Sequence, residues 1–101
     1  MELLNLELEE EIVATSTEIE FTADFVLYTL EGSVDMNIKI WEEEQEELNI
    51  FARYYLKGLT FWYLKVKDIA GDEISLNRDE LQECKNDIEN EIDKLIQQIE
   101  K

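Results

Sequence analysis

The chain has 101 residues, with 26 Asp and Glu against 9 Lys and Arg and a formal net charge of −17. This length is typical of one domain, and we expect residues 1–101 to form a single domain. The negative charge disfavours direct binding to nucleic acid or to an anionic membrane, because both depend on Lys and Arg. The charge favours a basic protein partner instead.

The sequence contains no His and one Cys. It therefore excludes a His-dependent catalytic triad, an intramolecular disulfide and a Cys-rich zinc site within the chain. No apolar stretch reaches the roughly 18 residues that a membrane-spanning helix needs, and the first residues do not resemble a signal peptide. We expect a cytoplasmic protein with no catalytic site, metal or cofactor.

Apolar and polar residues alternate in three segments, 4–12, 19–27 and 34–40. This alternation is typical of β-strands with one buried face, and three such segments in succession predict an antiparallel meander. The predicted hairpin turns are Thr15-Ser16 and Glu31-Gly32, the second because Gly accepts the positive φ that such turns require. With these turns, Phe25 pairs with Leu6 on one side and with Ile38 on the other.

Residues 48–68 are rich in aromatic residues and predict a further hairpin with its turn at Lys57-Gly58. A helix over residues 43–56 is the competing interpretation, because Glu-rich segments favour helix. Both faces of the hairpin are apolar, so the face away from the helix either joins the core or forms an interface. The residues of this candidate apolar interface are Trp41, Phe51, Arg53, Tyr55, Trp62 and Leu64.

After a predicted turn at Gly71-Asp72, residues 77–101 predict one long helix with Asn77 as N-cap and Glu80 in the capping-box position. Its apolar residues are spaced by three and four and form a single stripe. We therefore expect an α+β domain, with an antiparallel four- to five-stranded meander over residues 1–68 and the helix packed on its apolar face. The stripe consists of Leu81, Cys84, Ile88, Ile92, Leu95 and Ile99.

The polar face of the predicted strands is unusually acidic, since residues 1–38 contain no base. Alternate residues on a strand lie about 6.6 Å apart, and carboxylates at this spacing can imitate the phosphates of a nucleic acid. A face that is simply solvated is the competing interpretation, because charge on a sheet also discourages aggregation. The predicted acidic partner-binding face consists of Glu7, Glu9, Glu11, Glu18, Glu20 and Asp24, with Glu42, Glu43, Glu44, Glu46 and Glu47 in the following loop.

Little in the sequence indicates catalysis. Cys84 falls on the apolar stripe of the predicted helix, where a buried structural thiol is expected rather than a nucleophile. The three Gly residues are isolated from one another, so no phosphate-binding loop is predicted. In composition, although in no specific motif, the chain resembles phage-encoded DNA mimics and anti-defence inhibitors, acidic secretion chaperones and nuclease-immunity proteins.

Two functions are compatible with these observations. The first is a non-enzymatic inhibitor that mimics a polyanion and binds a basic nucleic-acid-handling protein, such as a nuclease, through the acidic face. The alternative is an oligomeric structural or chaperone-like adaptor, for example a homodimer, that binds through the aromatic hairpin.

Overall fold

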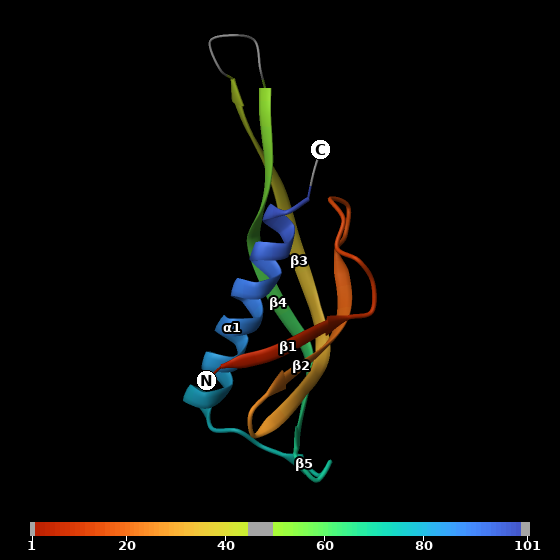
Figure 1. Ribbon diagram of the computed structural model, residues 1–101, viewed down its shortest axis with the longest axis vertical. Coiled ribbons are helices and arrows are strands. Elements are labelled where there is room, and N and C mark those ends of the chain that lie inside the picture. Colours follow the sequence, from red (N-terminus) through yellow and green to blue (C-terminus); the bar gives the residue numbers. More distant parts are fainter. Residues whose placement is uncertain (1, 45–49, 100–101) are drawn as a thin grey trace.

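The computed structural model describes residues 2–44 and 50–99, with the side chains of residues 2–40 and 54–99. A five-stranded antiparallel sheet in the order β1-β2-β3-β4-β5 packs against one long C-terminal helix (Figure 1). This arrangement confirms the predicted α+β fold. The elements are β1 (Leu3–Leu8), β2 (Glu18–Phe25), β3 (Tyr28–Glu44), β4 (Ile50–Asp68), β5 (Glu73–Ile74) and α1 (Arg78–Gln97).

The core lies between α1 and one face of the sheet, called here the inner face. In β2 and β3 the burial alternates as the sequence predicts, because every second side chain of a strand points to the same side. On α1, the side chains of Cys84, Ile88, Ile92 and Ile96 are fully buried. Ile96 completes the predicted stripe, while Leu81, Leu95 and Ile99 pack at its margins.

The start of α1 and the turn before it follow from local sequence, whereas the helix ends at Gln97, short of the predicted range 77–101. Asn77 caps the helix by accepting a hydrogen bond from the backbone N of Glu80 at 2.8 Å, and the Glu80 carboxylate accepts in return from the Asn77 amide. The cap confirms the predicted start of the helix, and the Glu80 side chain bonds to the side chain of Asn77 rather than to its backbone N as in a complete capping box. The turn before it is also confirmed, since Gly71 has a φ of 90° and its N donates to the carbonyl O of Asp68 at 3.0 Å.

The predicted turn at Glu31-Gly32 is wrong. Strands β2 and β3 are joined by Val26-Leu27, and Ile19 pairs with Val34 across the hairpin. Both placements of the turn keep Phe25, Val34 and Met36 on the inner face, but they differ over residues 27–30. The observed turn leaves Leu27 58% exposed and buries Tyr28 and Leu30 instead. The structure uses the earlier turn, and β3 then continues through Gly32 and pairs with β4 over its whole length.

The pairing of β1 with β2 also differs from the prediction, by two residues. Leu6 lies opposite Ala23 rather than Phe25, and a long loop over residues 9–17 replaces the tight Thr15-Ser16 turn. Within this loop the backbone N of Ser16 donates to the carbonyl O of Val13 at 3.0 Å. A shift of two residues keeps Leu6 and Leu8 on the inner face, as predicted. An irregularity between Leu3 and Asn5 places Leu3 on that face in place of Leu4, which is 59% exposed.

The predicted hairpin at residues 48–68 is wrong, because β4 is one continuous strand. Two β-bulges interrupt its pairing with β3, and the extra residues are Lys57 and Trp62. Each bulge reverses the alternation of the residues that follow. The reversal at Lys57 resembles a turn in the sequence, and the reversal at Trp62 puts Leu64 and Val66 on the inner face.

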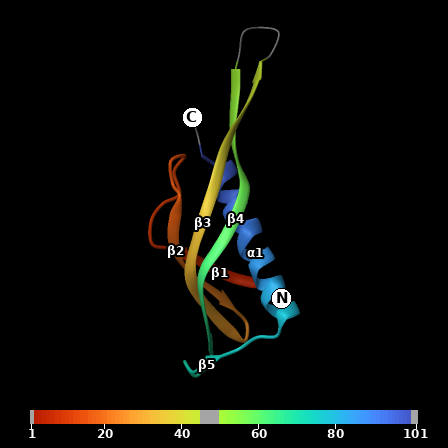
Figure 2. The same cartoon turned by 180° about the vertical axis from the view of Figure 1, so that it is seen from behind.

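The molecule is elongated, with extents of 57 × 22 × 19 Å. Strands β3 and β4 continue together beyond the end of α1 as a two-stranded ribbon (Figures 1 and 2). Near the base of this ribbon, the backbone N of Leu56 donates to the Asp93 carboxylate of α1 at 3.3 Å. The helix thus supplies an acceptor next to the bulge at Lys57.

Candidate functional site

A groove of about 500 Å³ crosses the face of the sheet that points away from α1, called here the outer face. Because the strands alternate, the residues between the buried ones point to this side. Five glutamates from three adjacent strands line the groove, together with Ser33 and Tyr63. The glutamates are Glu7, Glu9, Glu18, Glu20 and Glu31, and we call this site the acidic groove.

Two of these glutamates are held directly opposite each other. The backbone N of Glu9 donates to the carbonyl O of Glu20 at 3.1 Å, which continues the β1–β2 ladder beyond the end of β1. A hydrogen bond between their side chains, together with their mutual repulsion, raises the pKa of the Glu9 carboxyl above its ordinary value. Glu9 therefore holds a proton more readily than an isolated glutamate would.

Other acids of the outer face are anchored by neighbouring side chains. The Ser33 hydroxyl donates to Glu18 Oε1 at 3.1 Å, and the Thr29 hydroxyl donates to Asp24 Oδ1 at 3.0 Å. Glu31 Oε2 lies 3.5 Å from Lys67 Nζ on β4. These contacts fix the position of carboxylates that would otherwise move freely in solvent.

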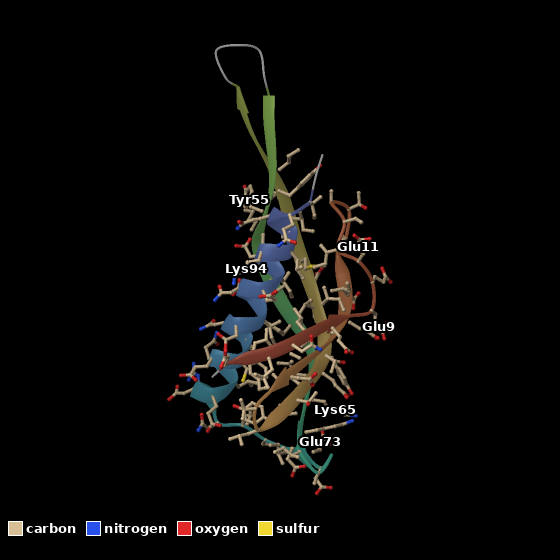
Figure 3. All side chains as sticks on the ribbon, viewed as in Figure 1. Glu9, Glu11, Tyr55, Lys65, Glu73 and Lys94 are labelled. Carbon is tan, nitrogen blue, oxygen red and sulfur yellow. The ribbon has the colours of Figure 1, made fainter. Side chains whose placement is uncertain are left out.

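Basic residues meet the acidic groove only from the β4 side, among the side chains that the structure describes. Lys65 Nζ lies 5.9 Å from the centre of the Tyr63 ring, and contact with Tyr63 followed by attraction to Glu73 and Glu31 raises the pKa of Lys65. Lys65 and Glu73 lie at the end of the sheet where β5 pairs with β4 (Figure 3). The outer face is thus acidic over β1 and β2 and basic over the last part of β4.

The predicted acidic residues are only partly brought together. Glu7, Glu9, Glu18 and Glu20 line the acidic groove. Asp24 lies on the same face outside it, and Glu11 lies in the loop after β1 against a second hollow near the end of α1 (Figure 3). Glu42, Glu43 and Glu44 belong to β3 rather than to a loop, with side chains outside the described part, and Glu46 and Glu47 lie outside the described residues altogether.

The candidate apolar interface is also divided. Trp62 is 67% exposed and Tyr55 40% exposed, whereas Leu64 packs against the core. The side chains of Trp41, Phe51 and Arg53 lie outside the described part of the structure. The sequence prediction missed Glu31, which it placed in a turn, and Tyr63, which it assigned to neither predicted site. The run of four apolar residues from Phe61 to Leu64, which interrupts strict alternation, was the available signal for Tyr63.

Cys84 is fully buried between α1 and the sheet, and its Sγ lies 3.7 Å from the Tyr28 hydroxyl. Burial raises the pKa of the Cys84 thiol, which keeps it protonated and unreactive. Within the described ranges, no three acidic or thiol side chains gather closely enough to hold a metal ion. No helix in the described part is both long enough and apolar enough to cross a membrane.

Comparisons with protein-family models, with curated proteins and with solved structures found no match for this chain. The acidic groove must therefore be interpreted from its own geometry and charge.

Proposed function

We propose that this chain is a non-enzymatic interaction protein that mimics a polyanion and inhibits a basic nucleic-acid-handling protein. The observation that carries the proposal is the gathering of five glutamates from three strands around one groove. Neighbouring strands lie about 4.8 Å apart and alternate residues about 6.6 Å apart, so the carboxylates form a two-dimensional array at nearly the spacing of phosphates.

The Glu9–Glu20 pair supports a binding role over simple solvation. Like charges placed directly opposite each other destabilise a sheet, and Lys in either position would remove the repulsion. The sequence instead keeps both acids and has no base before Lys39. A basic partner would supply the missing positive charge and relieve the repulsion.

The test is capture of target proteins from a bacterial lysate by the tagged chain, followed by elution in steps from about 0.1 to 1 M salt. Wild type is compared with a groove variant, which combines Glu7→Lys and Glu20→Lys. The control combines Glu2→Lys and Glu89→Lys, which change the net charge by the same amount outside the groove. We expect nucleic-acid-binding proteins that elute early and are displaced by duplex DNA. Because like-charge contacts cost several kcal/mol, the groove variant should weaken this binding by about 100-fold or more.

Equal loss of binding in the control variant would contradict a specific role for the groove. The exposed Trp62 favours a second candidate, an adaptor that binds through the aromatic side of β4. In that case the captured partner stays bound at high salt and is lost in the Trp62→Ala variant, while the groove variant binds normally.

A further inference from the structure

The outer face of the sheet is open where β2, β3 and β4 lie side by side. The helix covers the opposite face, and Figure 2 shows β3 and β4 uncovered toward the viewer. The pairing of the three strands aligns their outward side chains in rows that cross β3. The three rows are Glu20–Ser33–Tyr63, Thr22–Glu31–Lys65 and Asp24–Thr29–Lys67.

Charge on these rows is divided by β3. Two of the three β2 ends are acids, Glu20 and Asp24, whereas two of the three β4 ends are bases, Lys65 and Lys67. Strand β4 has no acid between residues 50 and 67. The two halves already attract each other within the molecule, because Lys67 on β4 pairs with Glu31 on β3 at 3.5 Å. A face with one acidic and one basic half is complementary to itself when it is turned around its middle.

We infer that the outer face binds a second copy of this chain around a two-fold axis that runs along β3. This rotation stacks the two sheets about 10 Å apart and lays β2 of each copy over β4 of the other. Asp24 then faces Lys67 of the second copy, and the same contact occurs twice. Lys65 faces Thr22, between the two acids of the opposite β2.

The shape of the face agrees with this arrangement. Trp62 and Tyr63 both stand opposite Ser33 at the bulge and are 67% and 54% exposed. The rotation carries these rings over the row that contains Glu20, where the acidic groove forms a hollow of about 500 Å³. Glu31 meets its own copy at the axis, and its ion pair with Lys67 offsets that repulsion.

This inference does not rest on the proposed function, and it concerns the purified chain alone. The two are linked by competition, because the second copy would occupy the surface that a basic target needs. In the dimer, Lys65 and Lys67 of the second copy would take the position of the basic residues of a target.

The test is sedimentation equilibrium of the purified protein from micromolar to submillimolar concentrations at about 0.15 M salt. Wild type should form dimers. The single variants Asp24→Lys and Lys67→Glu should each dissociate at about tenfold or more higher concentration, because each places like charges opposite each other twice. An equimolar mixture of the two variants should recover the wild-type dimer, since both contacts of the mixed dimer are again between opposite charges.

The matched controls are the two single variants Glu89→Lys and Lys94→Glu. They make the same two kinds of charge reversal on the exposed side of α1. These variants should dimerise as wild type does. Circular dichroism of every variant checks that the monomer is folded, and Trp62→Ser should weaken the dimer without altering the spectrum. A wild type that stays monomeric throughout, or a mixture that fails to recover the dimer, overturns the proposal.

Discussion

At the scale of single residues, Gly32 shows how a missing side chain sets the geometry of the sheet. It lies in the middle of β3, where a Cβ atom would stand 1.8 Å from the backbone carbonyl O of Tyr63. No other residue fits without displacing the backbone of β4 at its bulge. Gly58, in contrast, has open space where its Cβ would be.

We therefore expect Gly32→Ala to lower the free energy of unfolding by about 3 kcal/mol, because the new methyl group meets backbone rather than a flexible side chain. Urea denaturation measures this change. The control Gly58→Ala should stay within about 1 kcal/mol of wild type, since Ala also restricts the unfolded chain. A similar loss of unfolding free energy in both variants would contradict a steric requirement for Gly at position 32.

The Glu9–Glu20 pair gives a prediction for pH. The pKa of the Glu9 carboxyl is raised in the folded state. The stability that protonated Glu9 contributes is therefore fully present below the pKa that Glu9 has in the unfolded chain, and it is lost as the pH rises through the pKa that Glu9 has in the folded protein. Glu9→Gln should therefore stabilise the protein at pH 7, and its advantage should vanish near pH 4. Urea denaturation at both pH values checks this, with Glu2→Gln as the control; an advantage that is unchanged at low pH would contradict the raised pKa of Glu9.

At the scale of elements, β4 carries two single-residue insertions within one strand. The bulges at Lys57 and Trp62 each move the following residues to the other face. Because the reversals come in a pair, the strand returns to its original alternation and remains apolar on its inner face from Tyr54 to Val66. The second bulge also places Trp62 and Tyr63 together beside the acidic groove.

Deletion of Lys57 should therefore leave the fold intact. It joins Leu56 to Gly58, whose partners Ile38 and Asn37 are already neighbours on β3, so the strand pairs without a bulge. The cost should be limited to about 1–2 kcal/mol, including the hydrogen bond from Leu56 to Asp93. The control is deletion of Thr60, which turns one end of β4 inside out; two-dimensional NMR spectra should be dispersed for the first variant and collapsed for the second.

The same strand explains how far the sequence could be interpreted. Local signals identified the helix cap at Asn77, the turn at Gly71 and the inward residues of β2, because these depend on neighbours in the chain. The turn before β3 and the bulges in β4 depend on which strands pair, and a Gly next to Glu31 or Lys57 has the same local appearance in a turn and in a strand. The predicted acidic face therefore contained Glu7, Glu9, Glu18 and Glu20 of the acidic groove but lacked Glu31 and Tyr63.

At the scale of the whole molecule, sheet order determines which charges become neighbours. Strands β1 and β2 bring acids from the first 24 residues to one side, and β4 brings Lys65 and Lys67 to the other. Strand β3 lies between them and contributes the acid that joins the two halves. The acidic groove is thus a product of antiparallel order, since no contiguous segment of the sequence contains it.

The separation of charge across β3 also gives the outer face a permanent electric dipole. An approaching charged body experiences a torque as well as an attraction, so the molecule is turned toward a preferred orientation before any contact forms. Such pre-orientation acts on the rate of encounter and fades when dissolved ions shorten the reach of the field to about 10 Å or less. The order of the strands thereby influences how quickly this protein meets other molecules, in addition to how tightly it holds them.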